Sequence, residues 1–464
     1  MGKKDFAPVA TKERTLTTSD LFLIWFGAAI AITEIWAGGS DPLRNLGLIL
    51  GLVAIVIGRV VGNGLMAAMA RIGADTGLPT MVLTRPAFGI RGSYLPAICN
   101  VLQLIGWTGW MLFVGYLYLD TIGSYLGLPG GTAAPEIRIA WIVLLGLFCT
   151  LWAMGGRRFW QLVQRVGAAL LLLLTIALTV IVLQQYNIAE LLTAPRGLSL
   201  GVLNGADLVI AMSVSWLPLV ADYSRYATKP RAGAQGTFWG YFVGGTWMYA
   251  VGLLVALAAQ TDVPDQMVVQ VMSSQGLGWA IAAVVLVLLS TVTTTFLDIF
   301  STVVSSQNLT PGLPDKAGVV TAGVLGVLVA LVLNVDLYEP FLIAIGAIFL
   351  PAFTVVLTDY YLVSNRRVLT SQVDSAGGSY WYTGGFNLRA ILAWAVGFTV
   401  YDWAQGFASV NFFLGKIGTW TIGQTWAIET APFAYGASLP CILVTTIMYL
   451  LIVRLTGTGI RKKA

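Results

Sequence analysis

Apolar stretches of roughly 20 residues recur along this whole sequence, separated by short polar connections; a helix of that length crosses the hydrocarbon core of a bilayer. The pattern therefore predicts an all-α integral membrane protein with twelve transmembrane helices and a single domain over 1–464. The expected spans lie near residues 20–42, 46–70, 94–122, 139–155, 160–184, 203–222, 237–260, 278–305, 317–334, 338–363, 388–410 and 434–455.

The basic residues predict how these helices are oriented. With the N-terminus in the cytoplasm, the basic residues fall on the inner side, apart from Arg44, Arg59, Arg138, Arg196 and Lys416. Cytoplasmic connections of membrane proteins carry such an excess of Lys and Arg. We expect a multi-pass protein of the cytoplasmic membrane, without a signal peptide, whose N-terminus (1–19) and C-terminal tail (456–464) are both cytoplasmic. The inner connection 364–387 is rich in Gly and Ser and is expected to be a flexible loop.

Two predicted spans contain residues that interrupt a helix. Span 1 carries Glu34 beside a glycine pair, and span 6 carries Pro218, which removes a helix hydrogen bond. Irregular spans at corresponding places indicate inverted repeats with a binding site near the middle of the membrane. The predicted units are repeat 1 at 20–185, repeat 2 at 203–363, and two further helices at 388–455.

Ionisable residues within the spans are candidates for function, because a charge in the membrane interior is costly. They are Glu34, Arg59, Asp207 and Asp298. Glu34 and Arg59 lie at similar depths on adjacent spans and could instead form a structural pair. Asp207 could simply cap span 6, and Asp298 could line an exit path or bond hydroxyls of a neighbouring helix.

Spans 3 and 8 offer groups that suit a planar ring and a cation. Gln103 and Trp107 are four residues apart on one helix face, which places an amide beside a flat ring, although a Trp on such a helix often only packs. Span 8 is rich in hydroxyls, including Ser290 and Thr291. Hard cations prefer oxygen ligands, and a broken helix such as the one expected near Ala31 frees carbonyls as well.

Four stretches of the chain together resemble the nucleobase:cation symporter-1 family, whose members transport cytosine, allantoin, hydantoins and related rings. They are "GADTGLPTMVLTRPAFGIRGSYLP" at 73–96, "GWTG" at 106–109, "ADYSRYA" at 221–227 and "ST" at 290–291. The resemblance implies a leucine-transporter-type fold, a five-plus-five inverted repeat with two extra C-terminal helices. It also implies that Trp107 stacks on the substrate ring. Sodium would bind the carbonyls of Ala31, Glu34 and Val287 and the hydroxyls of Ser290 and Thr291.

The sequence departs from the family pattern at several pocket positions. Ser213 stands where several relatives have an aromatic residue, and Val292 and Phe296 stand where relatives have Asn. Spans 1 and 6 look most like the branch of hydroxymethylpyrimidine permeases, which import a thiamine precursor. The candidate substrate-binding residues are Glu34, Gln103, Trp107, Asp207, Ser213, Trp216 and Phe296.

The leading interpretation is a secondary symporter that moves a small heterocycle with sodium, or alternatively with protons, without a cofactor and without nucleic acid. A different ring, such as another nucleobase, a hydantoin or allantoin, is the alternative substrate. Enzymes need a nucleophile with its base or a metal cluster, and this chain has no histidine. No repeated filter element of a channel and no Gly-Lys-Ser/Thr phosphate loop occurs either.

Glu34 is the basis of the sharpest substrate hypothesis. A carboxyl group can bond the exocyclic NH2 and the neighbouring ring nitrogen of a 4-aminopyrimidine at once. The competing interpretations are the structural pair with Arg59 and proton coupling.

Overall fold

The computed structural model describes residues 7–125, 134–155, 157–193, 201–260, 264–310, 312–406 and 436–456, together with positions 127, 129, 409 and 410. Within these residues the regular structure is helical. The predictions for residues 1–6 and 457–464, and for Arg196 and Lys416, concern positions outside these ranges. Among the described residues, nine helices are long and apolar enough to cross a membrane, or ten when a bent pair is counted as one span.

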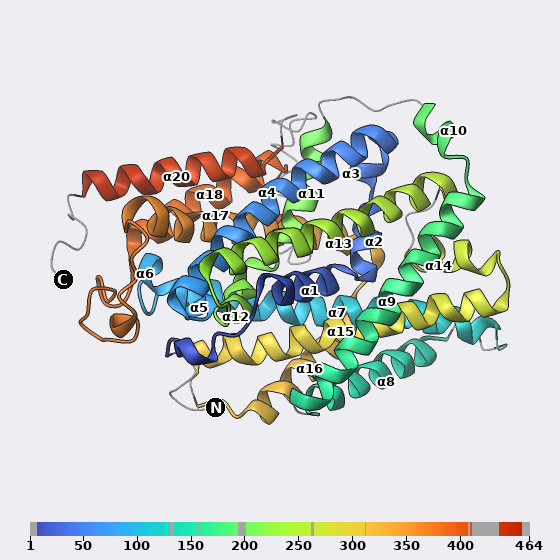
Figure 1. The fold of residues 1–464 in the computed structure, drawn as a ribbon, viewed down its shortest axis with the longest axis horizontal. Coiled ribbons are helices and arrows are strands. Elements are labelled where there is room, and N and C mark those ends of the chain that lie inside the picture. Colours follow the sequence, from blue (N-terminus) through green and yellow to red (C-terminus); the bar gives the residue numbers. More distant parts are fainter. Residues whose placement is uncertain are drawn as a thin grey trace.

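The long helices follow the predicted spans in order (Figure 1). They are α1 (Thr18–Ala29) with α2 (Ile32–Gly38), α4 (Gly47–Thr76), α7 (Tyr94–Tyr125), α8 (Pro135–Ala153), α9 (Arg157–Gln185), α11 (Val202–Val214) with α12 (Val220–Ser224), α13 (Pro230–Ala259), α15 (Leu277–Leu309), α16 (Asp315–Val332), α17 (Tyr338–Thr358), α18 (Leu388–Ala404) and α20 (Ser438–Leu455). Short helices connect them: α3 (Asp41–Arg44), α5 (Thr80–Leu83), α6 (Arg85–Phe88), α10 (Ile188–Thr193), α14 (Pro264–Ser273), a π-helical turn (Asp359–Val363) and 3-10 turns at Thr11–Glu13, Leu217–Leu219, Val335–Leu337 and Thr370–Gln372.

Both spans that were predicted to be irregular are interrupted. Thr17 and Asp20 form a capping box that starts α1, and the helix ends at Ala29. Two residues then leave helical geometry, and α2 continues at an angle of 64° to α1. Span 6 changes from α11 to a 3-10 turn at Pro218 before α12. Each interruption frees backbone groups in the interior, which is where a transporter binds its cargo.

The packing of the helices has the symmetry of an inverted repeat. Helix α1 packs on α13, and the equivalent helices of the other unit, α11 and α12, pack on α4. Helix α7 packs on α16, and its counterpart α15 packs on α8. Helices α4 and α13, and likewise α7 and α15, pack on each other as the two members of symmetric pairs. Helices α18 and α20 pack on each other and on α17, outside this scheme.

The glycines around the break in span 1 allow α2 and α13 to approach closely. A Cβ at Gly38 would overlap the backbone of Tyr249, and a Cβ at Gly252 would overlap the backbone of Ile35. Small residues permit such contact between membrane helices, where van der Waals packing supplies much of the stability. Gly38, one turn after Glu34, is therefore explained by the contact between α2 and α13.

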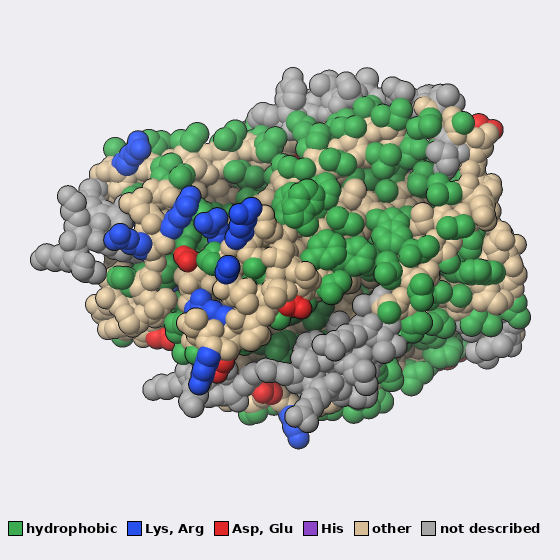
Figure 2. Space-filling view, viewed as in Figure 1, with side chains coloured by type: hydrophobic (Ala, Val, Ile, Leu, Met, Phe, Trp, Pro, Cys, Tyr) green, Lys and Arg blue, Asp and Glu red, His purple; other side chains and the backbone are tan. Residues whose placement is uncertain are grey.

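The described start of α1 and the end of α20 lie at the same end of the helix bundle, on the left of Figure 1. Figure 2 shows Lys and Arg side chains gathered at that end of the visible face, whereas the middle is covered by apolar side chains. The Gly- and Ser-rich connection also lies there, and it is folded where we expected a flexible loop. The Gly385 carbonyl accepts hydrogen bonds from the N–H groups of Arg91 and Gly92, and Asn387 bonds the carbonyls of Ala87 and Phe88.

Candidate functional site

The break in span 1 faces the hydroxyl-rich part of span 8. The backbone N–H of Ile32 donates a 3.0 Å hydrogen bond to Ser290 Oγ, although the two residues lie far apart in the sequence. The Thr291 hydroxyl points toward α7, where it lies 3.5 Å from the Met111 carbonyl. The structure thus brings Ala31 and Ser290 to the same break, and Val287 is buried one turn before Thr291 on α15. Hydroxyl and carbonyl oxygens are a donor set that fits a hard cation.

Glu34 lies at the start of α2, and its carboxylate is fully engaged inside the protein. One oxygen forms an ion pair with the guanidinium of Arg59, and the other accepts a hydrogen bond from the Tyr241 hydroxyl. The exposed fractions of the Glu34 and Arg59 side chains are only 2% and 0%. Glu34 and Arg59 therefore form the buried ion pair that the alternative interpretation expected.

Aromatic rings cover the guanidinium of Arg59. Its Cζ lies 4.9 Å from the ring centroid of Tyr241 and 4.5 Å from that of Tyr249, both on α13. Such cation–π contacts are strongest when water is excluded. A Cβ at Gly245 would collide with the guanidinium, so this glycine makes room for it. The Nε of Arg59 has no acceptor among the described residues.

Two further residues that were predicted to bind substrate form hydrogen bonds with this network and do not line an open pocket. Ser213 Oγ lies 3.4 Å from Arg59 Nη1 and donates to Asn63 Oδ1 at 3.0 Å. Trp216 Nε1 donates to the Tyr241 hydroxyl at 2.7 Å. Sequence reasoning missed Asn63, Tyr241 and Tyr249. The available signal for the tyrosines was their place in a glycine-rich span of a chain that also has an intramembrane arginine.

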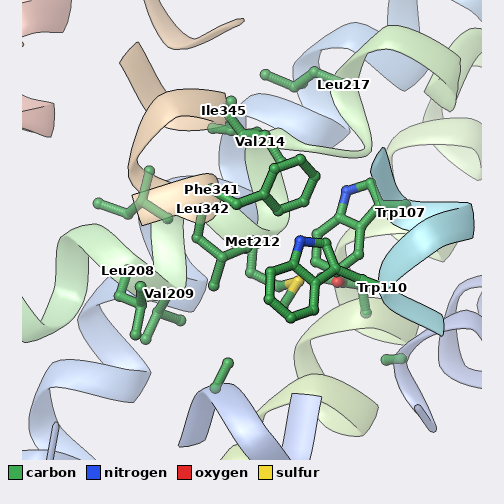
Figure 3. Close-up of a cluster of buried hydrophobic side chains, with 14 of the residues drawn as sticks. Trp107, Trp110, Leu208, Val209, Met212, Val214, Leu217, Phe341, Leu342 and Ile345 are labelled. Carbon is green, nitrogen blue, oxygen red and sulfur yellow. The ribbon is translucent and has the colours of Figure 1, made fainter. Parts of the chain in front are cut away.

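Trp107 lies in an aromatic wall formed by α2, α7 and α17. Figure 3 shows Trp107 and Trp110 beside Phe341 of α17 and Met212 of α11. The Phe341 ring meets Trp107 edge-on, with centroids 5.2 Å apart. Other side chains thus occupy the space beside the Trp107 ring in this conformation.

A second part of this wall closes over the break. Trp36 of α2 stacks on Tyr338 of α17, with ring centroids 3.9 Å apart and an interplanar angle of 6°. The Tyr338 hydroxyl donates a 2.8 Å hydrogen bond to the Thr33 carbonyl. The cleft between α2, α9, α13 and α15 next to Ser290 is too narrow for a water molecule. The conformation is closed around the break.

Gln103 of α7 is buried against the break in span 6. Its Nε2 donates to the Ser215 carbonyl at 2.6 Å and to Asn100 Oδ1 at 3.2 Å. Its Oε1 is buried and has no hydrogen-bond partner among the described residues. Asn100 in turn donates to Ser305 of α15 at 2.7 Å.

Two candidates lie apart from this centre. The Asp207 carboxylate accepts the N–H groups of Ala437 and Ser438 at the start of α20, and the Nε2 of Gln405. The alternative interpretation was that Asp207 caps span 6. Asp207 does cap a helix, but that helix is α20 and not its own. Phe296 stacks on Phe300, whose side chain is 41% exposed.

Comparisons with known proteins agree with this architecture. The sequence matches the family described as permeases for cytosine/purines, uracil, thiamine and allantoin over residues 8–428. It is 24% identical to a putative purine-cytosine permease of Bacillus subtilis, with 95% of this chain and 94% of the relative covered. It is 25% identical to the cytosine permease of Escherichia coli, with 85% and 88% covered. A hydantoin permease of Microbacterium maritypicum is 23% identical, with 92% and 89% covered.

A solved structure gives the same fold. It is a nucleobase-cation-symport-1 family transporter in a closed conformation with bromovinylhydantoin bound. The two chains superpose with a TM-score of 0.77 at 19% identity, over 98% of this chain and 95% of the other. A sodium-coupled sialic acid symporter has a TM-score of 0.60 at 13% identity, over 97% and 92%. The sequence match across nearly the whole length, together with this fold, establishes that the chain belongs to the family of permeases for cytosine/purines, uracil, thiamine and allantoin.

Proposed function

We propose that this chain is a secondary symporter that imports a planar nitrogen heterocycle, hydroxymethylpyrimidine or a related aminopyrimidine, together with sodium. The observation that supports it most directly is the hydrogen bond from Ile32 at the break in span 1 to Ser290 of span 8. It joins an interrupted helix of one repeat to the hydroxyl-bearing helix of the other, as in transporters that bind cargo and ion at the repeat interface.

In this proposal sodium takes its oxygens from both sides of that junction. The carbonyls of Ala31, Glu34 and Val287 and the hydroxyls of Ser290 and Thr291 are its ligands. An ion held by oxygens of both helices would bridge α2 and α15 at the break. This bridge gives a physical reason for coupling, because the ion and the ring then favour the same arrangement of the break.

The ring stacks on Trp107 once Phe341 moves away. Aromatic stacking is tolerant of ring type, so the polar groups around the platform must supply specificity. We assign Glu34 primarily to the pair with Arg59, because both of its oxygens already have partners. A direct contact between Glu34 and an amino ring requires that Tyr241 or Arg59 first release the carboxylate.

The orientation belongs to the proposal as well. The end of the bundle that carries the basic residues is assigned to the cytoplasm, because inner connections of membrane proteins are enriched in Lys and Arg. The membrane is then the cytoplasmic (inner) membrane, both chain ends are cytoplasmic, and the Trp36–Tyr338 stack lies on the outer side of the break.

The test is a binding screen of the purified protein with cytosine, hydroxymethylpyrimidine, hydantoin, allantoin, purines and thiamine, with and without sodium. We expect an aminopyrimidine to bind most tightly and sodium to raise its affinity. Equal ring affinities in sodium and in choline buffer, together with uptake driven by a proton gradient, would support the proton-coupled alternative instead. A hydantoin or allantoin preference would replace the aminopyrimidine assignment.

A further inference from the structure

Three exposed arginines at the basic end of the bundle have no acidic partner among the described residues. Arg71 lies near the end of α4, and Arg366 and Arg367 follow the π-helical turn after α17. The ion pairs that the described residues form use other arginines. The charges of these three side chains are therefore available to a partner outside the chain.

Two of the guanidinium groups flank one tyrosine. The Tyr361 hydroxyl donates a 2.9 Å hydrogen bond to the Ala68 carbonyl, which holds its ring against α4. Arg71 lies three residues beyond Ala68, on the next turn of the helix, and within electrostatic range of Tyr361. The Cζ of Arg366 lies 5.4 Å from the ring centroid of Tyr361. Arginines from two separate elements thus converge on one point of the surface.

The backbone after the π-helical turn is strained where it positions Arg366. Asn365 and Arg366 have φ angles of 48° and 60°, in the left-handed region that residues other than glycine rarely adopt. The Arg366 N–H donates to the Tyr360 carbonyl at 2.8 Å, and the Ser364 N–H donates to the Asp359 carbonyl at 2.7 Å. These bonds fold the chain back, so that the Arg366 side chain lies over Tyr361. Strained residues of this kind are found at ligand clamps and switches.

One acid lies close to these arginines without neutralising them. Asp75, one turn beyond Arg71 on α4, accepts a 2.6 Å hydrogen bond from the Tyr360 hydroxyl. Among the described residues no ion pair joins Asp75 to Arg71 or to Arg366. Three arginines beside one acid leave the site positively charged, and the guanidinium fork matches the oxygens of a phosphate.

An apolar stripe on α4 leads to the same point. Val53, Val56 and Val60 are exposed, and together with Gly64 and Arg71 they follow the spacing of one helix face. A Cβ at Gly64 would have no neighbour within 4 Å, so the surface is open there. A phosphate that carries an acyl chain matches both the arginines and the stripe, whereas a free phosphate matches the arginines alone.

We propose that Arg71 and Arg366 bind the phosphate of an anionic phospholipid whose acyl chain lies along the stripe at 53–64. Basic pockets between transmembrane helices bind the head groups of acidic lipids in this way. The lipid joins α4 to the turn after α17, so its binding stabilises the conformation in which these two elements meet. The site goes beyond the proposed function, because it involves neither the ring nor the ion.

The first test compares two lipids with the same acyl chains on the delipidated wild-type protein in detergent. Phosphatidylglycerol, phosphatidylcholine or inorganic phosphate is added, and native mass spectrometry and thermal unfolding are recorded. We expect phosphatidylglycerol to bind more tightly than phosphatidylcholine and to raise the unfolding midpoint, and inorganic phosphate at the same concentration to leave the midpoint unchanged. Equal effects of the two lipids would overturn the site, and an equal effect of inorganic phosphate would overturn its assignment to a lipid.

The second test is the double variant Arg71→Gln and Arg366→Gln. Its matched control is Lys229→Gln with Arg231→Gln, which removes two exposed charges at the start of α13, at the same end of the bundle. A basic residue near an acidic lipid contributes about 1 kcal/mol, about fivefold in affinity, so the arginine variant should bind phosphatidylglycerol about thirtyfold more weakly.

The control should retain nearly the wild-type affinity for phosphatidylglycerol. Both variants should unfold at the wild-type midpoint without lipid, because all four side chains are exposed. An equal loss of affinity in the control would mean that only net charge attracts the lipid, and unchanged affinity in the arginine variant would remove Arg71 and Arg366 from the site. Either result refutes the proposal and leaves the transport function untouched.

Discussion

Two buried acids of this permease, Glu34 and Asp298, have opposite surroundings. Glu34 has a cationic partner in Arg59, a hydroxyl donor in Tyr241, and aromatic rings around its partner. Asp298 has an oxygen that no described residue bonds. The difference teaches that a carboxylate in a membrane helix is not by itself a functional residue. Where the protein supplies the partners, the acid serves the architecture, and where they are missing, burial of the charged form is costly.

The largest expected effect concerns Glu34, the acid whose partners are present. Arg59→Met leaves Glu34 buried without its counter-charge, and breaking a buried pair from one side costs about 3–5 kcal/mol. We expect a large drop in the midpoint of thermal unfolding of the ligand-free protein in detergent. Arg71→Met, an exposed position on the same helix, should change it little.

The double variant sharpens this prediction. Glu34→Gln combined with Arg59→Met removes both charges, so the pair should recover part of the stability that either single variant loses. Additive losses in the double variant would mean that the two charges do not stabilise each other.

The next effect concerns the ring platform. Trp107→Ala should weaken substrate binding by about 1–3 kcal/mol, the range for aromatic stacking on a base, and Trp107→Phe should weaken it less because a ring remains. Equilibrium binding measures the loss, and unfolding of the ligand-free variant reports separately on packing. Wild-type affinity in Trp107→Ala would remove Trp107 from the site.

The sodium proposal predicts a loss of linkage. In wild type, sodium and ring should each raise the affinity of the other by the same factor, typically a coupling of about 1–3 kcal/mol. In the double variant Ser290→Ala and Thr291→Ala, ring affinity should no longer depend on sodium. The control is Thr293→Val on the same helix, because that hydroxyl bonds the Leu289 and Ser290 carbonyls of its own helix. Sodium dependence that survives the double variant would refute the assigned ligands.

The smallest expected effect is at the closed side of the break. Tyr338→Phe keeps the stack on Trp36 and removes only the hydrogen bond to the Thr33 carbonyl, worth about 0.5–1.5 kcal/mol. If the closed form dominates, this change raises the open population and with it the apparent ring affinity by up to about tenfold. Unchanged or weaker binding would mean that the hydrogen bond does not hold the permease closed.

The sequence predicts the helices of this fold well, because hydrophobic length and breaker residues act locally. Pro218 and the residues after Ala29 end helices where expected, and the Ser290 hydroxyl meets the break. Partners across the bundle are harder to predict. Nothing local in the sequence distinguishes Glu34, whose partners come from α4 and α13, from Asp298, whose neighbours supply no donor to one oxygen. The outcome depends on which helices pack against each acid.

The cap that Asp207 places on α20 has a consequence for the order of assembly. Asp207 belongs to the second repeat, yet the backbone groups that bond it come from Ala437 and Ser438. During synthesis this carboxylate enters the membrane long before those residues leave the ribosome. Until the last helix inserts, Asp207 lacks its two backbone donors and has only the Nε2 of Gln405 to bond, so truncation before α20 leaves one oxygen of this buried acid unsatisfied.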